Sequence, residues 1–238
     1  MQDTRQTKFI AAIMLAGVTA TAFSSYASHR LHPYLALAIL GFAVITSRLK
    51  VKLPGINGNM SVNLPFLLTA VMNLSGAEAV GITVVSTAVQ CWPKNGKMNR
   101  RQMEFNLSMM AFAAGVASLV YHFSLMRLGV PMTAGAALSA AALFLSQTGS
   151  VAGIVSLSEG KSATSTWRSI AELSFPYYVV SAGISVMVQT VSNRLGWELA
   201  LAVFPVMYLI HRSYRLYFSK WVEAPRTPVL VRAAGAGV

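Results

Sequence analysis

The sequence predicts an all-α, polytopic transmembrane helix bundle, and three observations lead to this fold class. Of 238 residues, 55% are hydrophobic and only 11% are charged, whereas a soluble domain is about 25% charged. The mean hydropathy is +0.56. Basic residues gather in short segments between apolar runs. These features exclude a soluble globular domain and a disordered chain. We expect one transmembrane domain over residues 1–221 and a short, flexible cytoplasmic tail over 222–238.

Eight apolar runs are candidate spans, because about 20 mostly apolar residues cross a bilayer as a helix. They are residues 9–26, 33–47, 60–74, 77–92, 105–125, 132–157, 175–191 and 196–211. The first run, which follows two basic residues, has a secretory signal peptide as its alternative interpretation. The third contains Asn63, Pro65 and Asn73, which favour an interrupted segment. A re-entrant hairpin over 60–92, with six full crossings, is therefore the alternative topology.

The basic residues predict the orientation of the bundle. With the N-terminus in the cytoplasm and eight alternating spans, only Arg30, Arg127 and Arg194 of the 19 lysines and arginines lie outside. Cytoplasmic loops of membrane proteins are enriched in such residues. Both termini are therefore predicted to be cytoplasmic. The formal charge of +12 fits anionic lipid headgroups, so we expect membrane lipids and no nucleic acid as partners.

Several short stretches, taken in order, resemble a known family. They are Arg48–Gly55, Gly58–Asn63, Ser75–Ala79, Glu104–Asn106, Glu159–Ser162, Trp167 with Phe175–Tyr178, and Arg212–Tyr217. This succession resembles the MASE-like polytopic membrane input domains that precede HD-GYP, GGDEF or kinase domains in bacterial signalling proteins. The resemblance covers roughly residues 9–221. It implies a multi-pass protein of the bacterial inner membrane that acts in signalling.

The end of the sequence departs from that family. Its members continue from the last span into a catalytic domain, whereas here only residues 222–238 follow Trp221, and Pro225 and Pro228 interrupt any helix. We therefore expect a stand-alone input module without an output enzyme.

Polar residues inside spans mark the candidate ligand site, since such groups are costly in a bilayer. We predict ligand contacts from Asn63, Asn73, Glu78 and Asn106. Each has a structural alternative. Glu78 could serve the N-terminus of a helix through the helix dipole. The asparagines could form hydrogen bonds between helices.

A second candidate surface follows the last span. Arg212, Tyr214, Arg215 and Tyr217 occupy the position of the output linker in the resembling family, so we predict that they couple the module to a partner. The alternative is that aromatic and basic side chains here anchor the chain at the membrane interface.

The sequence contains no recognised catalytic motif, and we expect a non-enzymatic protein without cofactor or metal. Cys91 is the only cysteine and forms no intrachain disulfide. The predicted function is a sensor-like signalling input module that acts through a separate cytoplasmic or membrane protein. The alternative is a small transporter or substrate-binding subunit, with a small-molecule pocket near the interrupted third span. The small residues Gly149 and Gly153 favour helix packing within the chain or, alternatively, a homo-oligomer.

Overall fold

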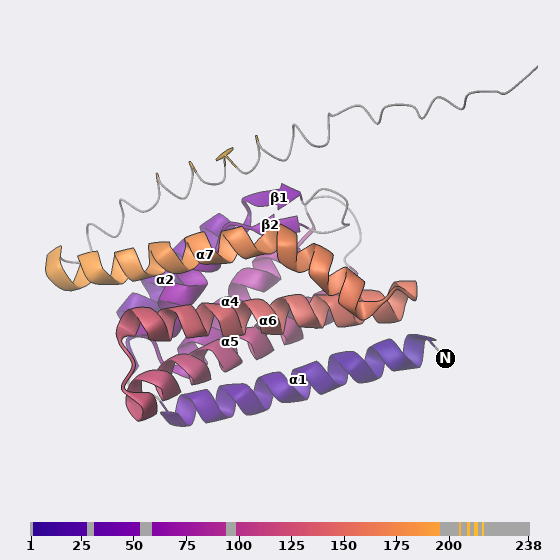
Figure 1. The fold of residues 1–238 in the computed structure, drawn as a ribbon, viewed down its shortest axis with the longest axis horizontal. Helices are drawn as coiled ribbons and strands as arrows, with labels where there is room; N and C mark the ends of the chain where they lie inside the picture. Colours follow the sequence, from indigo (N-terminus) through magenta and orange to yellow (C-terminus); the bar gives the residue numbers. More distant parts are fainter. Residues whose placement is uncertain are drawn as a thin grey trace, which may run out of the picture.

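The computed structural model describes residues 2–27, 31–52, 59–93 and 99–195, together with single positions at 205, 209, 212, 213 and 216. Within these residues the protein is all-α apart from one small ribbon, as predicted. Seven helices and two strands follow one another as α1 Gln2–Ala27, α2 Pro33–Ser47, β1 Lys50–Lys52, β2 Asn59–Ser61, α3 Leu64–Asn73, α4 Gly76–Cys91, α5 Arg100–Leu128, α6 Met132–Glu159 and α7 Ala163–Leu195. The long helices run side by side in one bundle (Figure 1).

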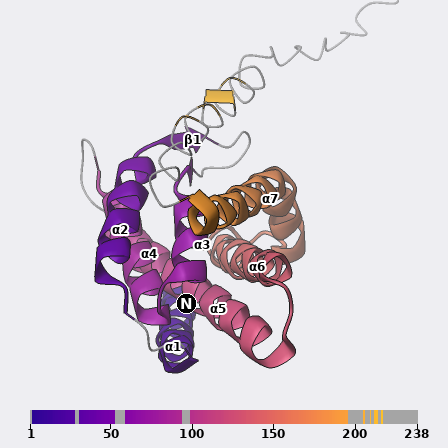
Figure 2. The same cartoon turned by 90° about the vertical axis from the view of Figure 1, so that its left-hand side faces the viewer.

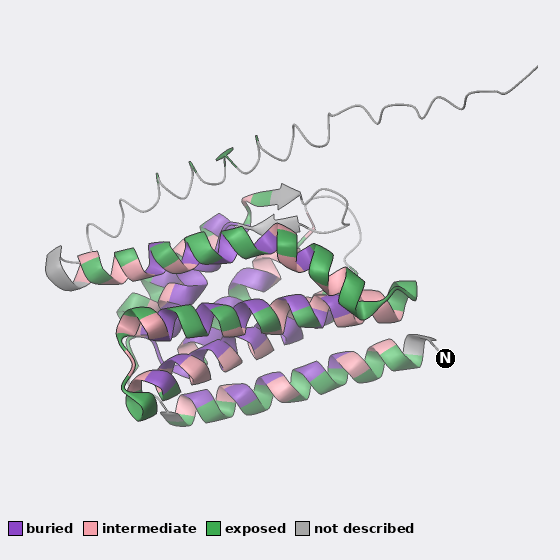
Figure 3. Ribbon diagram, in the orientation of Figure 1, coloured by how far each residue is buried: buried purple, intermediate pink, exposed green. Residues whose placement is uncertain are grey.

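Four of these helices are long and apolar enough to cross a membrane. The candidate spans are Thr4–Tyr26, Arg100–Leu128, Met132–Glu159 and Ala163–Ser192. At 1.5 Å per residue each is about 30 Å long or more, which matches the hydrocarbon thickness of a bilayer. Large apolar side chains such as Leu15, Phe23 and Leu145 are exposed on the bundle surface, as Figure 3 shows for the outward faces. Hydrocarbon is the environment that such a surface favours.

Small residues allow α1 and α5 to pack closely. A Cβ atom at Gly17 would lie 3.1 Å from the Phe112 backbone nitrogen, and one at Gly115 would lie 3.0 Å from the Ala20 Cβ. Such close approach is typical of helix pairs in membranes, where association depends on van der Waals contact. Of the predicted glycine pair on α6, Gly153 packs against Phe9 of α1, whereas Gly149 has open space around it.

The third predicted span needs a correction. Residues 60–74 form no single helix, because β2 occupies their start and α3 has only 10 residues. A helix of that length spans about 15 Å, half the apolar core of a bilayer. Pro65 falls in the first turn, where its missing N–H costs nothing. The preceding segment satisfies its backbone groups by antiparallel pairing of β2 with β1.

Helix α3 is buried inside the bundle. Leu67, Leu68 and Val71 are almost completely buried. The end-on view places α3 among α2, α4, α6 and α7 (Figure 2), and α3 also packs on α5. A short helix at this depth needs no lipid contact, because other helices surround it.

The last predicted spans are only partly described. The seventh, predicted over 175–191, belongs to the longer helix α7, which contains Pro176. The eighth, 196–211, and the tail, 222–238, lie outside the described residues except for exposed helical positions at Pro205 and Leu209. Eight crossings and the cytoplasmic placement of both ends therefore stay predictions.

Candidate functional site

A cavity of about 740 Å³ lies at one end of the bundle. Helices α1, α3 and α5 begin near it, and α4 and α6 end near it; α7 closes another side. The volume falls within the range of small-molecule sites, about 300–1,000 Å³. The cavity thus has the size and the helical setting of a ligand pocket.

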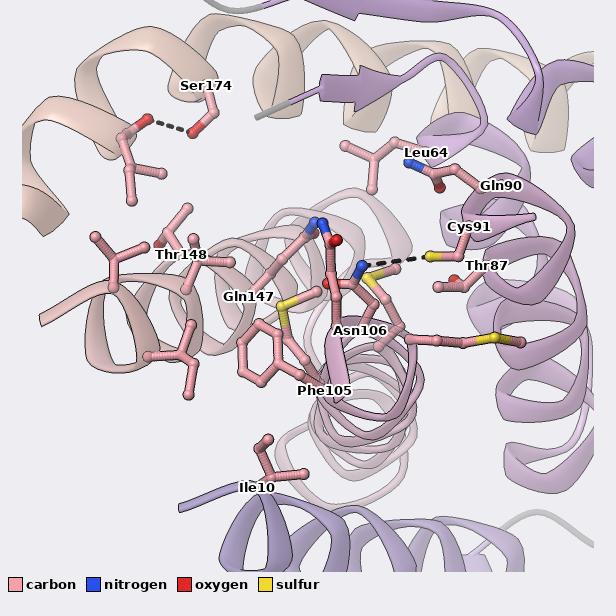
Figure 4. A pocket seen from close by; sticks show the side chains of 18 of the residues that line it. Ile10, Leu64, Thr87, Gln90, Cys91, Phe105, Asn106, Gln147, Thr148 and Ser174 are labelled. Atoms are coloured by element: carbon pink, nitrogen blue, oxygen red, sulfur yellow. Dashed lines mark hydrogen bonds between the residues drawn. The ribbon is translucent and has the colours of Figure 1, made fainter. Parts of the chain in front are cut away.

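Amide side chains from four helices line this cavity. They are Asn63 before α3, Gln90 on α4, Asn106 on α5 and Gln147 on α6. Figure 4 shows Gln90, Asn106 and Gln147 directed toward the same space from their three helices. Each amide carries two donors and an acceptor. The group can therefore hydrogen-bond either sign of polar ligand atom.

Each of three amides already has one protein partner. Asn106 donates from Nδ2 to the Cys91 sulfur at 3.3 Å, and Asn63 donates from Nδ2 to Ser86 Oγ at 3.5 Å. The Tyr178 hydroxyl donates to Gln147 Oε1. These bonds orient the amides and still leave several of their donor and acceptor positions for a ligand.

Helix α7 fixes the start of α3 at the cavity wall. The Leu64 backbone N–H donates to the Tyr177 hydroxyl at 3.3 Å, and Ser185 Oγ donates to the Pro65 carbonyl at 2.9 Å. The first N–H groups of a helix have no partner within the helix. Tyr177 satisfies one of them, so a movement of α7 would be felt at the cavity.

One hydroxyl in the cavity wall is unpaired. Thr87 is 3% exposed, and its Oγ1 has no hydrogen-bond partner among the described residues. One turn earlier, Thr83 Oγ1 donates to the Ala79 carbonyl at 2.8 Å. An unpaired buried hydroxyl costs about 1–3 kcal/mol. Thr87 therefore lies where a ligand or a water molecule would lower the energy of the protein.

The charged groups of the described lining have one sign. Lys50 of β1 and Arg101 of α5 line the cavity, and both are exposed. No aspartate or glutamate is among the described lining residues. The acids Glu159 and Glu172 pair elsewhere, with Lys161 at 2.6 Å and with Arg168 at 2.9 Å.

The inner part of the cavity is apolar. Its deepest lining residues include Leu67, Met109 and Met110, all nearly buried. Ile10 and Phe105 contribute further apolar surface. The site therefore combines a charged rim, neutral hydrogen-bonding groups and a hydrophobic interior.

Two of the four predicted ligand residues lie at this cavity. Asn63 and Asn106 are about one helix hairpin apart in the sequence, and both line it. Asn73 and Glu78 do not, because they lie at the opposite end of α3 and at the start of α4.

The structural alternative describes Glu78 and Asn73. Glu78 Oε2 accepts from the Ser75 N–H at 3.1 Å and from Ser75 Oγ at 2.8 Å, while Oε1 accepts from the His32 N–H at 2.9 Å. With the Glu78 N–H donating to Ser75 Oγ, this is a capping box. Asn73 donates from Nδ2 to the Thr69 carbonyl of its own helix at 2.9 Å.

Gln90, Gln147 and Thr87 were absent from the predicted site. The signal for the glutamines was an amide within an apolar run, which the sequence shows but does not assign to a partner. Nothing in the sequence separates Thr87 from Thr83, since both lie on the same apolar helix. Pairing of their hydroxyls depends on the folded structure.

The predicted partner-coupling surface is mostly outside the described residues. Arg212 is helical and exposed. Tyr214, Arg215 and Tyr217 are not among the described positions. The described residues contain no group of three His, Cys, Asp or Glu side chains that could hold a metal ion.

The fold defines an all-helical protein with four long apolar helices, which indicates a multi-pass membrane protein. No protein-family model, no curated protein and no solved structure matches the chain. The resemblance to MASE-like input domains therefore remains a prediction from the sequence.

Proposed function

We propose that the protein is a sensor-like, non-enzymatic membrane module that binds a small molecule in the cavity. The observation that carries this proposal is the convergence of four amide side chains on a cavity of about 740 Å³. Polar side chains are expensive in a membrane bundle and usually mark a site or a bond between helices. Here Asn106 and Gln147 do both, since each has a protein partner and also lines the cavity.

The proposed route of signalling is helix α7. Tyr177 and Tyr178 of α7 line the cavity, and Tyr177 also contacts the start of α3. In the sequence, α7 leads toward the basic and aromatic segment that includes Arg212 and Arg215. A ligand that favours one position of α7 would shift the population of that position. A partner protein of the bacterial inner membrane or cytoplasm would read this change.

Ligand capture tests the binding step. The intact protein is purified in mild detergent and studied by native mass spectrometry, with Asn106→Leu compared against Asn73→Ala. We expect a small molecule at one copy per chain in the wild type and in Asn73→Ala, and its loss in Asn106→Leu. A wild-type protein that carries only bulk lipid, and that no added small molecule stabilises thermally, would contradict the proposal.

Co-purification tests the signalling step. We expect a specific membrane or cytoplasmic protein to co-purify with the wild type and to be lost when Arg212 and Arg215 are both replaced by alanine. Arg127, an exposed arginine at the far end of α5, provides the control substitution. An unchanged set of co-purifying proteins would argue against the sensor function while leaving ligand binding intact.

The short helix α3 favours transport as a second candidate function. Its 10 residues end within the bundle, and its first residues line the cavity. Interrupted helices commonly form the substrate sites of transporters. Uptake into proteoliposomes of the molecule found by mass spectrometry, abolished by Asn63→Ala, would identify a transporter; binding without uptake would support the sensor.

A further inference from the structure

We propose that the ligand of this cavity is a single-chain amphiphile with an anionic head group. The inference rests on the proposed binding function and specifies the chemistry of its ligand. Three layers of the cavity wall support it, namely the charged rim, the neutral polar middle and the apolar interior. Each layer fits one part of such a molecule.

The rim selects a negative charge. Lys50 and Arg101 are exposed and line the cavity, and the described lining holds no carboxylate to neutralise them. Arginine and lysine are the side chains that most often hold carboxylate and phosphate groups. The nearby sequence adds Lys52, Lys94 and Lys97 and contributes no acid.

The helix ends do not reverse this sign. Helices α1, α3 and α5 begin near the cavity, whereas α4 and α6 end there. Each end carries about half a charge, positive at the start of a helix and negative at its end. These contributions nearly cancel, so the two cationic side chains determine the potential at the rim.

The middle layer binds oxygen atoms adjacent to the head group. Gln90, Asn106 and Gln147 come together there (Figure 4). Thr87, on the same wall, has an unpaired and buried Oγ1. Such a hydroxyl is expected to gain a full hydrogen bond when a ligand oxygen reaches it.

The interior fits an alkyl chain. From Arg101 at the rim to Met110 in the interior, the lining residues of α5 extend over about 13 Å at 1.5 Å per residue. Leu67 and Met109 provide a further wall of nearly buried apolar surface. Methionine adapts its shape to flexible ligands. A fully polar anion would leave this surface without a contact.

Photo-crosslinking of three probes tests the inference. The full chain is reconstituted in phosphatidylcholine vesicles with diazirine-bearing analogues of dodecanoate, dodecyl phosphate or dodecanol. We expect at least one anionic probe to label the peptides that contain Leu67 or Met109 and Met110 severalfold more than the neutral alcohol does. The anionic probe that labels more strongly identifies a carboxylate or a phosphate as the head group.

Charge-neutral variants locate the head group. The double variant Lys50→Gln with Arg101→Gln should lower labelling by the anionic probe about fivefold, since two exposed charge contacts are each worth up to about 1 kcal/mol. Labelling by the alcohol should not change. Arg127→Gln removes a charge from the other end of α5, about 39 Å away along the helix, and should leave both unchanged. An unchanged melting temperature of the double variant shows that folding is intact.

Two results would overturn the inference, and they differ in meaning. Equal labelling by the acid and the alcohol, unaffected by the double variant, would remove the anionic head group but leave a cavity that binds ligands. Absence of labelling by all three probes would overturn the amphiphile altogether. In that case native mass spectrometry decides separately whether another small molecule occupies the cavity and the proposed function survives.

Discussion

The two ends of the α3–α4 pair are polar in the sequence and differ in the structure. The cap end contains Asn73, Ser75, Gly76 and Glu78, and its hydrogen bonds close over three or four residues, apart from the contact with His32. The cavity end contains Asn63, Thr87, Gln90 and Cys91. There Asn63 finds its partner 23 residues away, and Thr87 has none among the described residues.

The comparison teaches how to interpret a polar residue in an apolar run. At the cap end the polar groups satisfy one another, so they stabilise a helix start and leave no capacity for a ligand. At the cavity end the polar groups come from separate helices and retain free bonding capacity. Ligand binding and stability are thus expected to depend on opposite ends of the same pair of helices.

Enlarging Gly76 should break the cap end most severely. A Cβ atom there would lie 2.7 Å from the Ser24 carbonyl carbon of α1, a backbone atom that has little freedom to move. We expect Gly76→Val to destabilise the protein by about 3 kcal/mol or to prevent its folding. Gly81→Val is the control on the same helix, because that glycine has open space around it. Thermal unfolding in detergent measures both, and an equal melting temperature would contradict the close contact.

Removing the carboxylate should weaken the cap end by a smaller amount. Glu78→Ala deletes the capping box and the contact with the His32 N–H. We expect a loss of about 1–2 kcal/mol with ligand binding unchanged. Glu172→Ala, which removes an exposed pair with Arg168 on α7, should cost less than about 0.5 kcal/mol. Loss of the ligand at unchanged stability in Glu78→Ala would place the ligand at the cap end instead.

Replacing Thr87 should have the opposite sign at the cavity end. Thr87→Val removes an unpaired buried hydroxyl at nearly constant volume, so the empty protein should gain about 1 kcal/mol. Ligand affinity should fall at the same time. Thr83→Val removes a paired hydroxyl one turn earlier and should not stabilise the protein. Melting curves with and without ligand separate the two effects, and a destabilised Thr87→Val would show that its hydroxyl has a partner.

The smallest effect is expected at Asn73. Its side chain bonds only to the Thr69 carbonyl of α3, which already belongs to a helix. Asn73→Ala should change stability by less than about 0.5 kcal/mol and leave ligand affinity unchanged. Asn63→Ala, at the other end of α3, should lower affinity severalfold. Equal affinities of the two variants, measured by ligand titration, would remove the distinction between the ends.

The apolar runs predicted most of the helices but not their lengths. The expected start and end of the fifth and sixth runs lie within α5 and α6, because long apolar stretches in lipid must be helical. The prediction failed at residues 60–74, where a ribbon and a short helix occur. A short apolar run has the same composition whether lipid or other helices surround it.

By itself, the sequence determined the class of protein and the position of most helices, since composition and run length follow directly from the need to bury backbone groups in a membrane. It also identified Asn63 and Asn106 as polar residues at depth. Only the tertiary structure decided that these two share a cavity with Gln90 and Gln147 while Glu78 caps a helix. The physical reason is that hydrogen-bond partners from different helices are chosen by packing, and packing depends on contacts between residues far apart in the chain.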